Sequence, residues 1–166
     1  MRIALALLAA VGSALIGRSI AQGCLRRAAA LRQAMDAMQL LRIQMLERLL
    51  PLHAALEKSG FEPFRLAGRL LAGGEGAASA WKKAAAQLTK RGATLDCLTA
   101  DDLAALSALF DGLGMTARAE QEVLFSSALR EVGRLESEAS KAGAEKGRLY
   151  TTLGLLCGLM LAIAFV

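Results

Sequence analysis

The sequence predicts an all-α fold: an antiparallel helical bundle flanked by N- and C-terminal transmembrane helices. Three observations predict it. The 166 residues contain only two prolines and few aromatic residues, while Ala, Leu, Arg and Glu, which lose little side-chain freedom in a helix, are abundant. Uncharged apolar segments stand near both ends of the chain. Between them, leucines and methionines recur every three or four residues, the spacing of an amphipathic helix.

The two apolar segments predict the domain organisation. Residues 3–16 read IALALLAAVGSALI and residues 150–166 read YTTLGLLCGLMLAIAFV, without a charged residue in either. A membrane-spanning helix needs about 17–25 such residues. We predict a first transmembrane helix over residues 1–20, a helical bundle over 21–148 and a second transmembrane helix over 149–166.

The first segment has an alternative interpretation as a signal peptide, with a small-residue cleavage site at residues 19–21. The protein would then be exported and anchored by its tail as an interaction module. Arg18 lies inside the would-be cleavage region, and the basic cluster that follows opposes export. These two features favour the retained anchor.

The net charge of +5 is concentrated beside the apolar segments. The basic residues at these two junctions are Arg18, Arg26, Arg27, Arg32, Lys146 and Arg148. Cytoplasmic flanks of membrane helices collect Lys and Arg, which also attract anionic lipid headgroups. We therefore predict a multi-pass protein of the cell membrane with a cytoplasmic central domain. Nucleic-acid binding is not expected, because no reading motif or aromatic stacking residues accompany the basic residues.

Small residues within the apolar segments predict that the two membrane helices pack together. Glycine and alanine recur at short helical spacings there, which lets two backbones approach closely in lipid. The candidate packing residues are Gly12, Gly17, Gly154 and Gly158.

The central domain reads as a series of helices. A long amphipathic helix is expected to run until Pro51, which lacks a backbone donor and interrupts it. A short helix over residues 51–58 follows, with Gly60 as its stop. Pro63 suits the first turn of the next helix, which residues 73–74 end.

Three more helices complete the expected bundle. One covers residues 75–88 and carries Trp81, which we expect in the core. The next is capped by Thr99, has acidic residues in its first turn and ends at Gly114. The last is capped by Thr116 and runs from residue 117 to the second apolar segment.

No catalytic, cofactor-binding or metal-ligating constellation is recognisable, and we predict a protein that is not an enzyme. Residues 73–76 read GGEG, but the Lys and Ser/Thr of a phosphate-binding loop are missing. His53 is the single histidine, so no imidazole-based metal site is expected. The three cysteines form no C-x-x-C pair, which fits a reducing compartment.

Several motifs in order along the chain resemble the stage III sporulation protein AB family of endospore-forming bacteria. Residues 146–159 read KGRLYTTLGLLCGL, similar to the family's K-x-K-L-Y-x-x-L-G-x-L-x-G-L ending. Residues 113–121 read LGMTARAEQ, similar to its L-G-x-S-D-x-x-x-Q turn, although Ala117 replaces the acid. Residues 80–81 match an Ala-Trp pair, and residues 51–56 match a P-L-x-x-A-L kink.

The resemblance implies a role in endospore formation as a membrane component of the secretion-like channel complex between mother cell and forespore. It implies a location in the mother-cell or outer forespore membrane and a cytoplasmic domain similar to that of type II secretion platform proteins. The implied partners are a secretion-type ATPase and other membrane subunits, within a multi-subunit assembly.

The turns between helices are the expected docking surface, because loops carry contacts more often than the helices that hold them. We predict docking over residues 57–63, 73–75, 89–94 and 112–116. The candidate docking residues are Gly60, Phe61, Gly73, Glu75, Arg91, Gly114 and Thr116.

Overall fold

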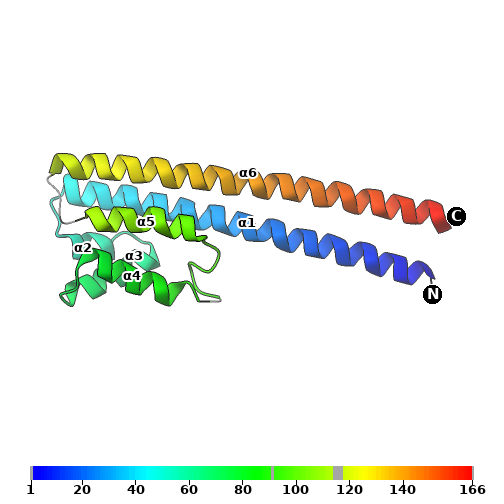
Figure 1. Ribbon diagram of the computed structural model, residues 1–166, viewed down its shortest axis with the longest axis horizontal. Coiled ribbons are helices and arrows are strands. Elements are labelled where there is room, and N and C mark those ends of the chain that lie inside the picture. The colour runs from blue at the N-terminus through cyan, green and yellow to red at the C-terminus, as the bar shows by residue number, and fades with distance from the viewer. Residues whose placement is uncertain (1, 91, 114–117, 166) are drawn as a thin grey trace. The chain divides into compact units, whose positions relative to one another are not determined.

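Figure 1 shows a computed structural model of the chain. It describes the backbone of residues 2–90, 92–113 and 118–165, and the side chains of residues 22–90, 92–113, 120–149 and 152–153. Throughout this described part the regular secondary structure is helical, as predicted. The chain forms two compact units: residues 27–137, and residues 1–26 together with 138–166. The predicted bundle at 21–148 overlaps the first unit.

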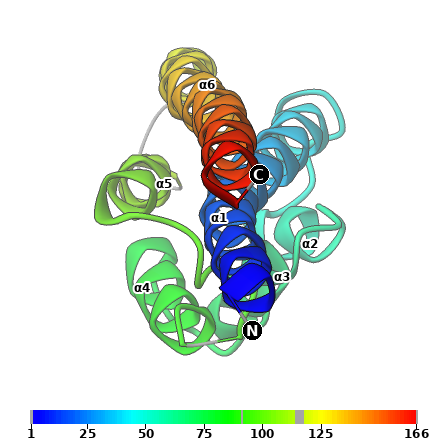
Figure 2. The same ribbon diagram turned by 90° about the vertical axis from the view of Figure 1, so that its right-hand side faces the viewer.

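The helices follow the predicted order. They are α1 (Arg2–Leu46), α2 (Leu52–Glu57), α3 (Glu62–Ala72), α4 (Ala77–Leu88), α5 (Ala100–Gly112) and α6 (Arg118–Phe165). Within the unit of residues 27–137, Figures 1 and 2 place α6 on one side of α1 and the α2–α3 pair on the other.

The end of α1 differs from the prediction. The helix was expected to continue to Pro51, but it ends at Leu46. Leu49 takes a left-handed φ of 54°, and the Leu50 amide donates to the carbonyl of Gln44 at 3.0 Å. A residue before proline avoids the α conformation, so the chain leaves the helix ahead of the proline and Pro51 serves as the N-cap of α2.

An aromatic cluster forms the centre of the core in residues 27–137. The rings of Trp81 and Phe110 stack with centroids 4.6 Å apart, and Phe64 packs edge-on against both. Trp81 is fully buried, which confirms its predicted core position, and its Nε1 donates to Ser107 Oγ at 3.0 Å. The cluster thereby joins α3, α4 and α5.

A partly buried ion pair ties the start of α5 to α1. Thr99 and Asp102 form the predicted cap as a complete capping box, because each side chain accepts from the other residue's amide. Arg27 Nε and a terminal nitrogen donate to the two carboxylate oxygens of Asp102 at 2.7 and 2.8 Å. Arg27, which the sequence grouped with the basic residues at the membrane junctions, therefore pairs with a carboxylate of the bundle.

Opposing effects act on the pKa of the Asp102 carboxyl. Burial raises the pKa, but hydrogen bonds from Arg27 and Thr99 outweigh burial and hold the pKa below its usual value. The carboxylate is thus charged, and it satisfies both the helix start and the guanidinium.

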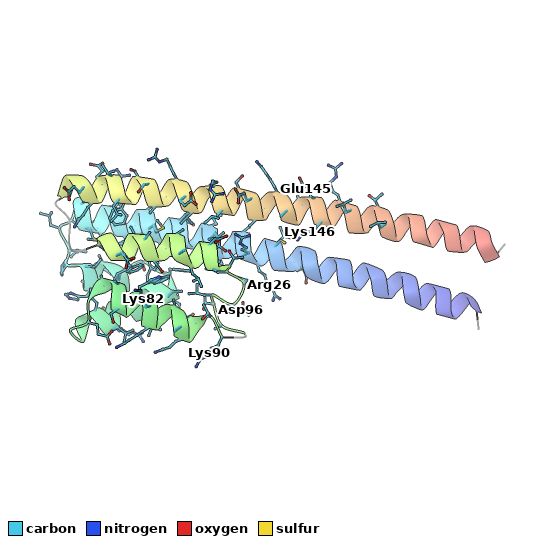
Figure 3. The ribbon with its side chains drawn as sticks, viewed as in Figure 1. Arg26, Lys82, Lys90, Asp96, Glu145 and Lys146 are labelled. Carbon is cyan, nitrogen blue, oxygen red and sulfur yellow. The ribbon has the colours of Figure 1, made fainter. Side chains whose placement is uncertain are left out.

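In the other unit, the first part of α1 and the last part of α6 run side by side (Figures 1 and 2). A Cβ at Gly143 of α6 would lie 3.4 Å from the Cβ of Cys24 and 3.3 Å from a terminal methyl carbon of Leu25. Lys146 Nζ lies 3.9 Å from Cys24 Sγ, and Figure 3 labels Lys146 and Arg26 on the two helices. A glycine at this position brings the two helices close.

No helix within the described part of the chain combines the length and hydropathy that a membrane crossing requires. Most side chains of the two predicted transmembrane segments, residues 1–20 and 149–166, lie outside that part, although their backbones are helical from residue 2 and up to residue 165. The transmembrane assignment stays a prediction.

Candidate partner-docking site

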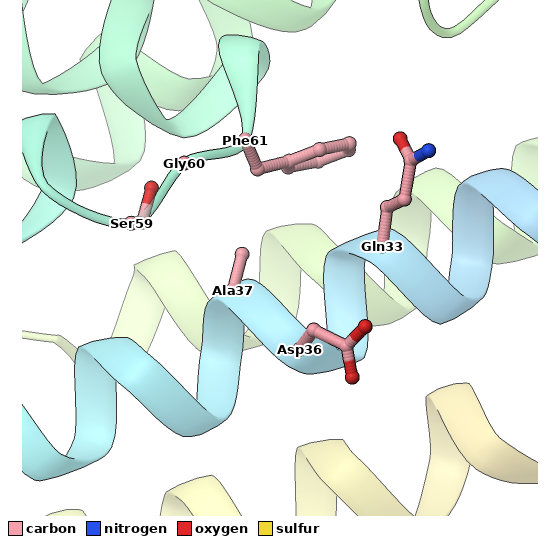
Figure 4. Close-up of a pocket in the computed structure, with 6 residues that line it drawn as sticks. All are labelled: Gln33, Asp36, Ala37, Ser59, Gly60 and Phe61. Carbon is pink, nitrogen blue, oxygen red and sulfur yellow. The ribbon is translucent and has the colours of Figure 1, made fainter.

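A hollow of about 190 Å³ opens between α1 and the turn that joins α2 to α3. We call it the α1–turn hollow. Figure 4 shows the residues that line it: Gln33, Asp36 and Ala37 from α1, and Ser59, Gly60 and Phe61 from the turn. The predicted docking turn at residues 57–63 supplies one wall, and α1 supplies the other.

The turn holds its shape through local hydrogen bonds. Ser59 is buried, and its Oγ donates to the Leu56 carbonyl at 2.7 Å. Gly60 follows with a φ of +77°, a left-handed conformation that glycine adopts without a steric cost. A Cβ at Gly60 would meet nothing within 4 Å, so the backbone here faces open space. Gly60 was predicted as the stop of this helix; α2 ends at Glu57 with Lys58 as its C-cap, and the left-handed Gly60 follows two residues after the cap.

Phe61, one of the predicted docking residues, is almost entirely buried. Its side chain is 4% exposed and packs edge-on against Phe64, with ring centroids 5.2 Å apart. In Figure 4 the ring lies over α1 near Ala37 and Gln33. In the sequence Phe61 lies in the turn predicted at residues 57–63, but its ring packs against Phe64 of the aromatic cluster and forms a wall of the hollow.

Close contact between α2 and α3 fixes the turn. A Cβ at Gly68 of α3 would lie 3.0 Å from the His53 carbonyl and 3.0 Å from Leu56 Cβ. Both distances are shorter than ordinary van der Waals contact, so a side chain at this position would require its neighbours to shift. Sequence reasoning did not single out Gly68, and a lone glycine inside a helix was its only signal.

The α1 wall continues along an uncovered face of the helix. Asp36, Leu40 and Ile43 are spaced four and three residues apart and share that face. Leu40 is 46% exposed and Ile43 40% exposed. The carboxylate of Asp36 is also exposed, and none of the described side chains pairs with it.

The other predicted docking residues are not brought to the hollow. Gly73 is exposed at the C-cap of α3. Glu75 accepts from Lys83 and Ser79 of α4, and the hydrogen bond from Lys83 lowers the pKa of the Glu75 carboxyl. Arg91, Gly114 and Thr116 lie outside the described residues.

Four of the basic residues predicted to meet lipid headgroups are exposed: Arg26, Arg32, Lys146 and Arg148. Arg32 also pairs with Glu136 at 3.1 Å while 73% of its side-chain surface stays exposed. The Arg18 side chain and the packing around the four predicted packing glycines lie outside the described part; those glycines are Gly12, Gly17, Gly154 and Gly158.

The fold defines the class of protein to which the chain belongs. This is an all-α bundle protein whose described residues hold no cluster of three or more His, Cys, Asp or Glu arranged for a metal ion. The α1–turn hollow lies beside the exposed Leu40 and Ile43 of α1.

Comparison with known proteins identifies the family of the chain. The model of the stage III sporulation protein AB family matches residues 2–166, and the chain belongs to this family. A solved structure titled stage III sporulation protein AB (SpoIIIAB) shares the fold, with a TM-score of 0.61 and 22% identity over 72% of this chain and 97% of that one. No curated protein matches. The resemblance seen in the sequence is thus confirmed, and with it a role in sporulation.

Proposed function

We propose that the chain is a non-enzymatic integral membrane platform subunit of the secretion-like complex required for endospore formation. In this role it docks a secretion-type ATPase to the membrane assembly. The observation that carries the proposal is the family match over residues 2–166, which includes both apolar segments as well as the bundle.

Exposed side chains at the inner ends of these segments support membrane anchoring. Leu25, Leu149 and Leu153 are 52%, 61% and 53% exposed. Arg26 and Arg148, each adjacent to one of these leucines, are exposed as well. Apolar side chains beside cationic ones suit the boundary between hydrocarbon and headgroups on the cytoplasmic side. The bundle would then hang in the cytoplasm from two helices in the mother-cell or outer forespore membrane.

Topology is tested by labelling intact cells. A variant with its native cysteines replaced carries a new cysteine at the exposed Lys90, and the cells receive an impermeant thiol reagent. We expect labelling only after lysis, and labelling before lysis would contradict a cytoplasmic bundle. Intact mass of the same protein checks the first segment, since loss of residues 1–21 would favour the exported alternative.

Docking is tested with the purified full chain in nanodiscs. The secretion-type ATPase of the complex is titrated onto the discs and its binding measured by interferometry, with empty discs as the control. Saturable binding to loaded discs alone is the expected outcome. Equal binding to empty discs would contradict the platform role.

A further inference from the structure

We infer that the chain associates with a second copy of itself, with α4 of one copy laid against α5 of the other and lysines of α4 facing aspartates of α5. The inference goes beyond the proposed function, because docking an ATPase requires no contact between copies. Only the direction in which the two copies run rests on the membrane anchoring proposed above.

The charges of the two helices are segregated. Residues 77–90, which form α4 and its C-terminal end, contain three lysines and no acidic residue. Residues 92–113, which lead into α5 and form it, contain four aspartates and no basic residue. Asp102 is buried with Arg27, but the other three aspartates and all three lysines are exposed. The surface of the bundle thus presents a cationic helix and an anionic helix.

The exposed face of α5 suits a second helix. Its exposed residues recur at spacings of three, four and three, and they are Asp101, Ala104, Ala108 and Asp111. Residues at these spacings share one side of a helix. The two aspartates stand about 15 Å apart along the axis, with alanines between them. Small side chains let another helix approach closely, so that it would meet a carboxylate at each end of the contact.

Neither aspartate of this face has a partner among the described residues. Asp101 lies in the first turn of α5, where the helix dipole favours a negative charge. Asp111 is the last residue but one of the helix, where the dipole disfavours a negative charge. Since no side chain of the described bundle offsets this cost, Asp111 gains from a cation that another molecule supplies.

The exposed side of α4 carries matching cations. Lys82 and Lys90 are eight residues apart, about 12 Å at the rise of a helix, and the exposed Ala86 lies midway between them (Figure 3). Neither lysine forms a pair within the part of the chain that the structure describes, whereas Lys83 pairs with Glu75. The flexible four-carbon stem of lysine covers the small difference between this spacing and that of the aspartates.

The two faces also match in level. α4 and α5 run in opposite directions and are joined at one end by an irregular segment (Figure 1). Trp81 stacks on Phe110, with ring centroids 4.6 Å apart. Their sequence neighbours Lys82 and Asp111 therefore lie at one level of the helix pair, and the charges beside the connecting segment lie at the other level.

A second copy fits both faces in one register. Copies anchored in one membrane run in the same direction, so residues at the same level oppose each other. Lys82 of one copy then faces Asp111 of the other, and Lys90 faces Asp101. Opposite charges at both ends of the contact favour this register over any that brings like charges together. The chain itself supplies both faces, so the occupant of each is a second copy.

Charge reversal followed by mixing tests the inference. The basic form carries Asp101→Lys and Asp111→Lys, and the acidic form carries Lys82→Asp and Lys90→Asp. Full chains bearing a donor or an acceptor dye are mixed in detergent micelles, and their association is measured by energy transfer. We expect the wild type to associate and each form alone to associate at least about tenfold more weakly, because like charges then face each other.

A mixture of the two forms should recover the association, since each lysine of the basic form then faces an aspartate of the acidic form. Misfolded variants would not be rescued by mixing. The matched control carries Glu47→Lys and Glu57→Lys, at two exposed acids outside α4 and α5, and should associate like the wild type. No association of the wild type, undiminished association of either form alone, or no recovery in the mixture would overturn the inference.

Crosslinking in membranes checks the register. In chains without native cysteines, one tagged copy carries Lys90→Cys and a differently tagged copy carries Asp101→Cys. A short bismaleimide should join the two copies. Lys90→Cys with Asp111→Cys is the matched control and should crosslink far less, because the second site lies about 15 Å along α5 from the first. Equal crosslinking of the two pairs would contradict the contact.

The ATPase titration onto nanodiscs keeps this inference apart from the proposed function. If the wild type binds the ATPase but the two forms fail the mixing test, the inference fails and the platform role remains. If the ATPase does not bind but mixing recovers the association, the platform role fails and the contact between copies stands.

Discussion

At the residue scale, one carboxylate does more for the bundle than its neighbours do. Asp102 has a fully buried side chain, caps α5 and binds Arg27, whose side chain keeps 23% of its surface exposed. Next to it, Asp101 is exposed on the same helical turn. Two adjacent aspartates thus have different roles, because successive residues on a helix point in different directions.

Replacing Asp102 should therefore be costly. We expect Asp102→Ala to lower the free energy of unfolding by about 2–3 kcal/mol, somewhat less than for a fully buried pair because Arg27 regains some solvent. Urea denaturation of the full chain in micelles, followed by circular dichroism, measures this. Asp101→Ala is the control and should cost less than about 1 kcal/mol. Equal losses for the two variants would contradict the role of the ion pair.

The same carboxylate predicts a dependence on pH. The pKa of Asp102 is lower in the folded protein than in the unfolded chain, so ionisation favours the fold. The stabilisation from this ionisation is complete above the pKa of an aspartate in the unfolded chain, about 3.9. It disappears as the pH falls through the lower pKa that Asp102 has in the folded protein. The stability difference between wild type and Asp102→Asn should thus be constant near neutral pH and narrow below about pH 4. A difference that does not change between about pH 7 and about pH 3 would contradict this prediction.

At the element scale, the geometry of the docking turn depends on how closely α2 and α3 approach. Gly68 makes this approach possible, since the positions that a Cβ would contact include backbone atoms of α2 that cannot rotate away. The turn carries Gly60 and Phe61, so the packing of the two helices also sets the width of the α1–turn hollow.

Gly68→Ala tests this packing. We expect it to separate α2 from α3 and to lower the free energy of unfolding by about 1–3 kcal/mol, the usual cost of overpacking. Gly23→Ala is the control, because that helical position has nothing within 4 Å of a Cβ and alanine there should stabilise the helix by about 0.5–1 kcal/mol. Thermal denaturation measures both, and effects of the same sign would contradict the packing argument.

At the scale of the whole molecule, the buried core lies mainly within residues 27–137, while the apolar segments belong to the other unit. Folding of the bundle and anchoring to a membrane should therefore be separable.

A shortened chain tests this separation. We expect residues 22–149 to unfold cooperatively and to be extracted by carbonate, whereas the full chain should stay with the membrane pellet, since two apolar helices are removed from water there. Circular dichroism and sedimentation after extraction measure the two properties. Extraction of the full chain by carbonate without detergent would contradict membrane anchoring.

Much of the fold follows from local signals in the sequence. Thr99 predicted the start of α5, and Pro63 lies in the first turn of α3. Gly60 is the left-handed glycine in the turn that follows α2. Such signals can be read from the sequence because caps, prolines and left-handed glycines act within a few residues. The end of α1 was placed too late, since the helix ends at Leu46 and Leu49 takes a left-handed conformation two residues before Pro51. No pattern in the sequence announces a leucine in that conformation.

By itself, the sequence determined the helical class, the order of the helices and the membership of the sporulation family, since these depend on spacing along the chain. Only the tertiary structure decided that Arg27 belongs to Asp102, 75 residues away, that Phe61 turns inward, and that Asp36 lines an open hollow. The physical reason is that burial and pairing are set by which helices meet, and contacts between residues distant in the chain leave no local spacing to read.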